Sequence, residues 1–265
     1  APEGFVWIAN SPFRHGGSDP DLLQNLPAGQ SDLGGFWIGR LEVALSDYLL
    51  FVLERADGKG YCVPESPSAR ETYGGDRPIE IIPALGAAPR RTELIIPSEK
   101  EKGWRLLNSE LADSPLQGIS HLAALEYAHW LSGRTPGWRF RLPTDLEWEK
   151  AARGADGRRF VWGDYFVWSF CSSKLGPHPA YRRFPRERGA FPFDESVFGV
   201  RDLAGSVVEF TVGRTPVSPH FRSCRGGGWD GFDEYRFRAD TRFGVPADST
   251  QTSCGIRLVA EREGN

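Results

Sequence analysis

The chain has 265 residues, with 32 basic and 35 acidic side chains that give a net charge of −3. This near balance excludes the strongly basic surface that binds nucleic acids or anionic membranes, and no apolar run reaches the length of a membrane span. Nine Trp, 17 Phe and seven Tyr beside 31 Gly and 20 Pro predict an aromatic core wrapped in long irregular segments, not a helical bundle.

The cysteines indicate a reducing environment. Cys62, Cys171, Cys224 and Cys254 share no CxxC spacing and are too few for a disulfide scaffold in a chain of this length. We therefore expect a cytoplasmic location. The first residue is Ala and the sequence contains no Met, so we expect this chain to be part of a longer protein.

The first elements alternate between strands and a helix. Apolar runs at residues 5–8 and 35–39 predict two strands that pair, with a polar loop at residues 14–27 between them. From Leu41 the apolar spacing becomes helical, and we expect that helix to end near Asp57. Residues 58–115 are rich in Pro, Gly and charge, and they predict a decorated insertion with short strands near 93–96 and 104–106.

Two further helices have local start signals. Ser120 is the expected N-cap of a helix that runs to Ser132. Its expected apolar positions are Leu122, Leu125, Tyr127, Ala128 and Leu131. Its two histidines have no third ligand at metal-binding spacing, so we interpret them as structural. Thr144 and Glu147 form the pattern of a capping box before a helix that extends to Arg153.

Five motifs, in this order, carry a family resemblance: RLPTDLEWEKAARG at 141–154, VWGD at 161–164, FGVRDLAGSVVEF at 198–210, RGGGW at 225–229 and CGIRL at 254–258. Together they resemble the formylglycine-generating-enzyme (sulfatase-modifying factor) domain family over nearly the whole chain. The resemblance implies an α+β, C-type-lectin-like fold, loop-rich, with two main helices around small twisted antiparallel sheets. It also implies a single domain that spans residues 1–265.

The catalytic residues of that family do not carry over. The oxidase branch uses a copper-binding cysteine pair just after the glycine motif, where this sequence has Asp230–Gly231 and the neighbourhood of Glu234–Tyr235. The sulfoxide-synthase branch needs iron held by histidines of an added helical domain that this sequence does not contain. The resemblance therefore predicts a non-catalytic member without a cofactor.

The family's calcium site is also altered. Ser206 stands where Asn is usual and Val208 where Trp is usual, although Glu209 remains. Because Ca²⁺ takes six or more oxygen ligands and a hydroxyl is a poor one, we favour a second interpretation over bound Ca²⁺. In this interpretation Glu209 is a buried carboxylate that accepts hydrogen bonds from loop donors.

We expect the function to lie in residues 223–258. The glycines at 226–228 permit positive φ and close approach of neighbouring chain, and Arg236, Arg238 and Arg242 offer forked donors that can hold a long loop rigid. We predict that Trp229, Arg236, Arg238 and Arg257 belong to the scaffold. The stretch also resembles the variable proteins of diversity-generating retroelements, in which substitutions fall between fixed scaffold residues.

This second resemblance predicts a ligand-binding face. Phe232 and Phe243 are its expected apolar anchors, flanked by hydroxyls and carboxylates as in adaptable paratopes, although either ring could instead belong to the core. The predicted face consists of Asp230, Gly231, Phe232, Asp233, Thr241, Phe243, Gly244, Val245, Thr250, Thr252, Ser253 and Cys254.

The expected partner is a protein or another macromolecular ligand, and neither nucleic acid nor a membrane. Similar domains, with openings like PEGFV at residues 2–6, occur at the C-terminus of bacterial serine/threonine kinases, so the resemblance also allows fusion to an N-terminal kinase. The alternative function is that of an oxygen-dependent metal enzyme of the formylglycine-generating or sulfoxide-synthase type. Its metal ligands would have to be residues that the sequence does not reveal.

Overall fold

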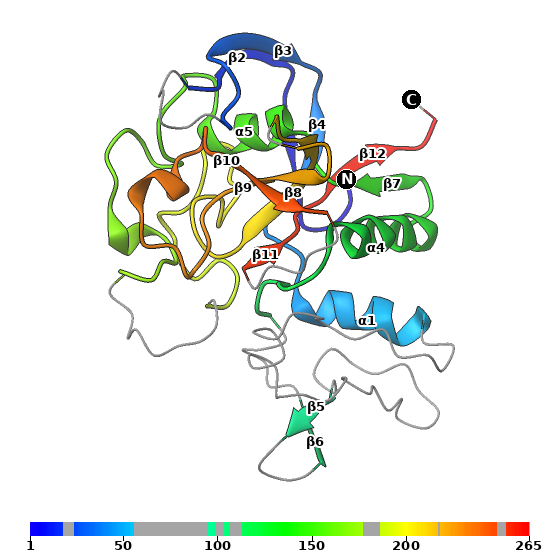
Figure 1. Ribbon diagram of the computed structural model, residues 1–265. Coiled ribbons are helices and arrows are strands. Elements are labelled where there is room, and N and C mark those ends of the chain that lie inside the picture. Colours follow the sequence, from blue (N-terminus) through cyan, green and yellow to red (C-terminus); the bar gives the residue numbers. More distant parts are fainter. Residues whose placement is uncertain are drawn as a thin grey trace.

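A four-stranded antiparallel sheet joins the two ends of the chain. The computed structural model describes residues 1–17, 24–55, 95–98, 103–106, 113–176, 186–216, 218–247 and 253–264. The strand order in this first sheet is β1 (Phe5–Ile8), β4 (Phe36–Gly39), β12 (Val259–Arg262) and β7 (Trp138–Arg141) (Figure 1). β1 pairs with β4 with Val6 opposite Ile38, which confirms the predicted pairing of the first two runs.

A second sheet carries the C-terminal stretch. Its strand order is β10 (Arg242–Pro246), β9 (Phe221–Arg225), β8 (Val208–Arg214) and β11 (Cys254–Gly255). β10, β9 and β8 run antiparallel, whereas β11 runs parallel to β8. The sequence predicts a long loop after the glycines at 226–228, so β10 corrects that expectation. Backbone pairing with β9 places Phe243 opposite Cys224 and makes this segment a strand.

The remaining strands form two hairpins. β2 (Ser11–His15) pairs with β3 (Gly29–Leu33), so the predicted loop at 14–27 begins inside a strand. The polar residues of β3 lack the apolar alternation by which a strand is recognised. β5 (Ile95–Ser98) pairs with β6 (Gly103–Leu106), near the two short strands predicted there. The rest of the predicted insertion at 58–115 lies largely outside the described residues, and the single domain of residues 1–265 stays a prediction.

Three α-helices are present in the described residues: α1 (Leu45–Arg55), α4 (His121–Arg134) and α5 (Asp145–Arg153). The Ser120 side chain accepts a hydrogen bond from the backbone N–H of Ala123, and the capping box at Thr144 is complete, so both predicted starts are confirmed. The predicted end of α1 near Asp57 lies outside the described residues. None of the described helices is long and apolar enough to cross a bilayer.

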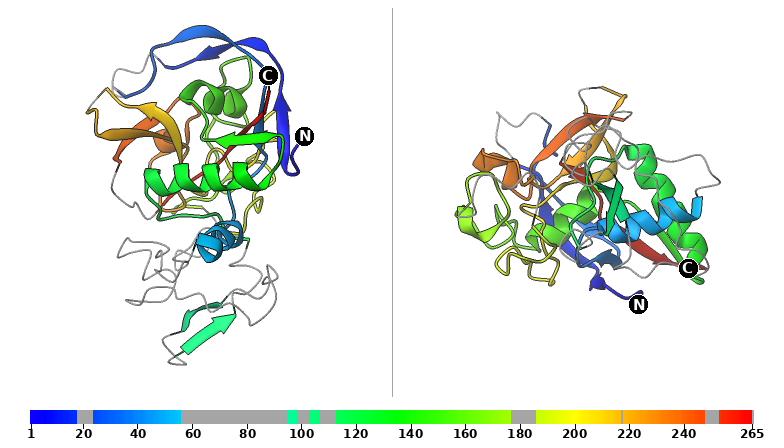
Figure 2. Two further views of the ribbon diagram at one scale, coloured as in Figure 1. Left: turned by 90° about the vertical axis from the view of Figure 1, so that its right-hand side faces the viewer. Right: turned by 90° about the horizontal axis from the view of Figure 1, so that it is seen from below.

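The buried face of α4 differs from the predicted one. Leu122 is 63% exposed and Leu125 is 39% exposed, which corrects their assignment as core positions. Tyr127 and Ala128 are buried as predicted, together with His121 and Ala124, because α4 lies along β7 and turns this side inward (Figure 2).

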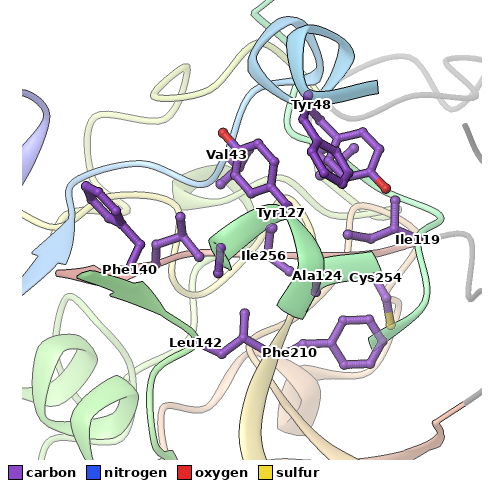
Figure 3. Close-up of a cluster of buried hydrophobic side chains, with 14 of the residues drawn as sticks. Val43, Tyr48, Ile119, Ala124, Tyr127, Phe140, Leu142, Phe210, Cys254 and Ile256 are labelled. Carbon is purple, nitrogen blue, oxygen red and sulfur yellow. The ribbon is translucent and has the colours of Figure 1, made fainter. Parts of the chain in front are cut away.

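Two hydrophobic clusters fill the interior. The first lies where α1 and α4 meet the sheets, and includes Tyr48, Tyr127, Phe210 and Ile256 (Figure 3). The second surrounds Trp148 of α5, which is fully buried. α5 therefore lies beneath the C-terminal stretch and connects it to the core.

Candidate functional site

A glycine turn forms the base of the predicted face. Gly226 has φ of 77°, and a Cβ built there would lie 2.9 Å from the carbonyl oxygen of Leu203. A Cβ on Gly227 would lie 2.4 Å from the Phe237 ring and 2.6 Å from the oxygen of Ala204. Both positions therefore require glycine.

The turn is bonded to the segment that precedes β8. The N–H of Gly227 donates to the carbonyl of Ala204 at 2.7 Å, and the N–H of Trp229 donates to the carbonyl of Ser206 at 2.7 Å. The Trp229 indole also donates to Gln117 Oε1 at 2.8 Å, as expected of a scaffold residue. These bonds fix the backbone from which residues 230–237 extend.

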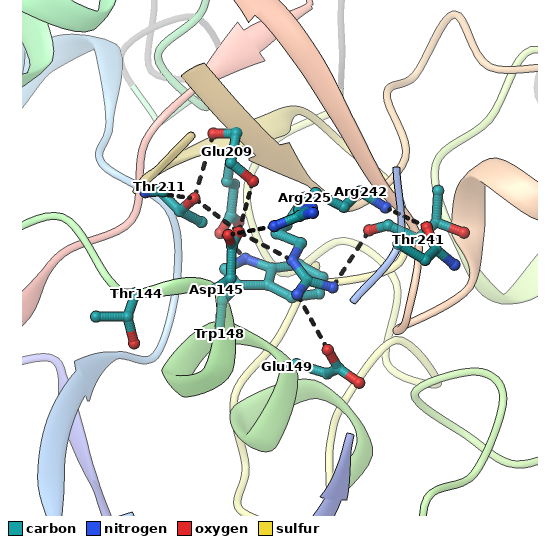
Figure 4. Close-up of polar contacts among 12 residues, drawn as sticks. Thr144, Asp145, Trp148, Glu149, Glu209, Thr211, Arg225, Thr241 and Arg242 are labelled. Carbon is teal, nitrogen blue, oxygen red and sulfur yellow. Dashed lines mark hydrogen bonds and ion pairs between the residues drawn. The ribbon is translucent and has the colours of Figure 1, made fainter. Parts of the chain in front are cut away.

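Buried ion pairs lock β9 and β10 onto α5 (Figure 4). Arg225 has no exposed surface, and its guanidinium lies 3.2 Å from Asp145 and 3.0 Å from Glu149. Arg242 lies 3.2 Å from the other oxygen of Asp145, and its Nε donates to the carbonyl of Gln24. Burial alone would raise the pKa of Asp145, but Arg225, the neighbouring hydroxyl donors and Arg242 hold it below its usual value.

Glu209 is the buried carboxylate that the sequence predicted. Its oxygens accept hydrogen bonds from Arg257 Nη2 at 2.7 Å and from the Trp148 indole at 2.5 Å. Arg257 also donates to the carbonyl of Gly39, which ties the C-terminal segment to the first sheet.

This arrangement does not fit the family's calcium site. A guanidinium already occupies the carboxylate of Glu209.

Phe232 is an exposed aromatic residue of the predicted face. Its side chain is 53% exposed, and Lys174 Nζ lies 5.6 Å from the centre of its ring. The N–H of Lys174 donates to the carbonyl of Gly231 at 2.9 Å, so a distant loop supports this position. Asp230 is exposed and Asp233 is half-buried beside it.

Phe243 is both a surface residue and a core residue, the two roles that the sequence left open. It is half-buried and packs against the first hydrophobic cluster. The guanidinium of Arg236 lies 5.7 Å above its ring and 5.8 Å above that of Tyr235. The Arg236 side chain is 42% exposed, so this residue is part of the surface as well as the scaffold.

Several residues of the predicted face are interior residues, and we correct them here. Thr241 is 1% exposed, Val245 is 8% exposed and Cys254 is 2% exposed, while Gly231 is also buried. The Thr241 hydroxyl donates to the carbonyl of Tyr235 at 2.6 Å. Val245 on β10 and Cys254 on β11 point inward, and Thr241 and Gly231 are buried in the segment before β10, so none of the four can contact a ligand.

The remaining predicted positions are either half-buried or outside the described residues. Gly244 and Ser253 are half-buried, while Thr250 and Thr252 lie outside the described residues. Sequence reasoning missed Lys174 and Tyr235, of which Tyr235 is 40% exposed. We use the term recognition face for the residues that present surface here: Lys174, Asp230, Phe232, Asp233, Tyr235, Arg236 and Phe243.

The structure brings together two thiols that the sequence placed at opposite ends of the loop. Cys224 and Cys254 share a side-chain hydrogen bond, and burial, followed by the contact with Cys254, raises the pKa of Cys224 well above its usual value. The pair lies in the hydrophobic interior. The positions of the oxidase cysteines, at 230–231 and 234–235, hold no sulfur.

Curled small sheets, few helices and long ordered loops define a C-type-lectin-like fold. The chain belongs to the sulfatase-modifying factor enzyme 1-like domain family, whose model matches residues 1–262. The match to the family model confirms the family that the five motifs implied, and the observed fold confirms the fold class.

Relatives of this family differ in activity. The chain is 34% identical over 164 residues to inactive C-alpha-formylglycine-generating enzyme 2 of Mus musculus, a match that covers 55% of this chain and 52% of the relative. It is 27% identical over 253 residues to hercynine oxygenase of Mycolicibacterium smegmatis, with 91% and 49% covered. The chain thus spans about half the length of these curated relatives.

A solved structure shows the same fold. Treponema denticola variable protein 1 aligns with a TM-score of 0.67 at 16% identity, over 97% of this chain and 94% of that protein.

Proposed function

We propose that this chain is a non-catalytic binding module that holds a protein ligand on the recognition face. The observation that carries the proposal is the exposed ring of Phe232, 53% accessible, on backbone that buried contacts fix below it. An apolar side chain held in place before binding loses little conformational entropy when a partner covers it. Phe232 has the properties of an interface anchor.

The surroundings of Phe232 provide a polar rim. Lys174 and Arg236 contribute cations, and Asp230 and Asp233 contribute carboxylates. Mixed charge around an aromatic anchor is typical of protein interfaces. A nucleic-acid or membrane ligand would favour a basic surface, so we propose a protein partner in the cytoplasm.

The enzyme alternative rests on relatives that are named as enzymes, among them hercynine oxygenase and formylglycine-generating enzyme. The similarity to hercynine oxygenase extends over 91% of this chain, so an oxygen-dependent reaction is the second candidate. The similarity to an inactive relative and the absence of sulfur at 230–231 and 234–235 support the binding module instead.

Site-specific photocrosslinking tests the proposal. A photoreactive phenylalanine analogue replaces Phe232 in one variant and Trp7 in the control, since Trp7 of β1 is 47% exposed outside the recognition face. In lysate of the source cells, position 232 should give a discrete protein adduct that unlabelled wild-type chain competes away. A Phe232→Ala chain should compete poorly.

Two results would favour the alternatives. Adducts identical at positions 232 and 7, or competition by Phe232→Ala equal to that by wild type, would exclude the recognition face as the binding site. Oxygen uptake above the buffer rate with a cysteine peptide plus copper, or with hercynine plus iron, would favour the enzyme.

A further inference from the structure

A group of buried carboxylates lies outside the recognition face. Glu42, Asp194, Asp202 and Glu209 are each between 0% and 2% exposed. Arg257 is also fully buried, and among the described residues it is the cation in ion pairs with this group, at 2.7 Å from Glu209 and 3.9 Å from Glu42. Four negative charges beside one positive charge would be strongly unfavourable in a dry interior.

Two of these carboxylates are satisfied by backbone donors. Asp194 accepts hydrogen bonds from the N–H groups of Ala204 at 3.0 Å and Gly205 at 2.9 Å. Asp202 accepts a hydrogen bond from the N–H of Gly189. Such bonds stabilise the ionised form of a carboxylate.

Glu42 lacks a backbone donor from another residue in the described part of the chain. Neither of its carboxylate oxygens makes a hydrogen bond with a donor there, yet its side chain lies within hydrogen-bond reach of Asp202. Two carboxylate ions have only acceptors to offer each other, whereas a carboxylic acid can donate to a carboxylate.

We propose that Glu42 is a neutral carboxylic acid in the folded protein and donates its proton to the carboxylate of Asp202. The buried group then carries one negative charge fewer, and the protonated oxygen of Glu42 gains an acceptor. Folding of this region takes up a proton, which makes the Glu42–Asp202 pair a pH-sensitive element of the core.

Burial, and after it the surrounding charges, set the direction of the effect. Burial first, and then the neighbouring Asp202, raise the pKa of Glu42 well above its usual value, against the opposing effect of Arg257. Burial likewise raises the pKa of Asp202, and that of Asp194 to about 7. The other charges that face the pair are Glu209 and Arg201, together with Arg188, which donates to the carbonyl of Glu42.

A pKa raised by folding stabilises the folded state at low pH, and this stability is lost as the pH rises through the folded value. Below about pH 6.5, His121 acts in the opposite direction, because burial lowers its pKa. Above about pH 6.5 His121 no longer titrates, so from there upward the stability contribution of the pair should decrease as the pH rises.

Thermal unfolding of wild type, Glu42→Gln and the surface control Glu3→Gln tests the proposal across this range. Gln is neutral and can donate to Asp202 at every pH. Glu42→Gln should therefore unfold at a higher temperature than wild type at pH 8.5 and show a flatter pH dependence, while Glu3→Gln should follow wild type. A Glu42→Gln chain with the wild-type slope and a lower midpoint at pH 8.5 would overturn it.

A second measurement applies even if Glu42→Gln does not fold. Native wild type at pH 8, above the value for Asp194, should still show the infrared carbonyl band of a protonated carboxyl group, and the band should disappear on unfolding. Absence of this band from the native protein would contradict the proposal.

Discussion

Arg225 on β9 and Asp145 in the first turn of α5 lie 3.2 Å apart, and Arg225 is completely buried. The same guanidinium contacts Glu149 one turn further along the helix. One side chain thus holds the second sheet against α5.

Replacing Arg225 with Ala should destabilise the protein by about 3–5 kcal/mol, because Asp145 and Glu149 would stay buried and each would lose a cation, with Arg242 and Arg153 left to pair with them. Urea unfolding measures the loss. Arg222→Ala is the matched control on the same strand, where the side chain donates to the carbonyl of Pro219 at the surface, and it should change stability by less than about 0.5 kcal/mol. Equal losses in the two variants would contradict this account of the network.

Gly226→Ala should destabilise the fold more than Gly199→Ala. Both glycines have positive φ, 77° and 82°, so both variants suffer the left-handed strain of about 1–2 kcal/mol. A new Cβ at 199 meets nothing within 4 Å, whereas one at 226 lies 2.9 Å from the Leu203 oxygen. Melting temperatures of the two variants give the comparison, and similar values would show that close approach at Gly226 is unimportant.

Two phenylalanines of one loop should respond oppositely to truncation. Phe232 is 53% exposed, while Phe237 is fully buried. Phe232→Ala should leave the free energy of unfolding within about 0.5 kcal/mol of wild type, whereas Phe237→Ala should lose about 3–5 kcal/mol. Chemical denaturation of both variants checks this. A large loss at Phe232 would make it a structural residue and remove the anchor of the recognition face.

The buried thiols should not react in the folded protein. Burial raises the pKa values of Cys171 and Cys224, and the thiolate is the reactive form. In a Cys62→Ser background, a thiol-specific chromogenic reagent should label none of Cys171, Cys224 and Cys254 natively and all three in denaturant. Rapid native labelling would show that this core opens readily.

Local signals in the sequence predicted local structure well. The Ser120 cap and the Thr144–Glu147 capping box involve atoms within one helical turn, so neighbouring residues are sufficient to specify them. The burial of Glu209 was also predictable, because a family motif surrounds it.

The shape of the recognition face depends on long-range packing. Whether Thr241 and Val245 face inward depends on how β10 pairs with β9, and no residue near them determines that pairing. Lys174 lies beside Phe232 because its backbone N–H donates to the carbonyl of Gly231, which belongs to a loop far away in the sequence. Cys224 and Cys254 meet because β9 and β11 both border β8, an order that spacing along the sequence does not contain.

The C-terminal stretch has two parts that differ in how well they tolerate substitution: the glycine turn and the exposed residues that follow it. At Gly226 and Gly227 any larger side chain collides with backbone or a buried ring. At Asp230 and Phe232 the side chains extend into solvent. Substitutions at the exposed positions therefore leave the folded framework intact, so the surface of this stretch can change in sequence without extra stability being needed first.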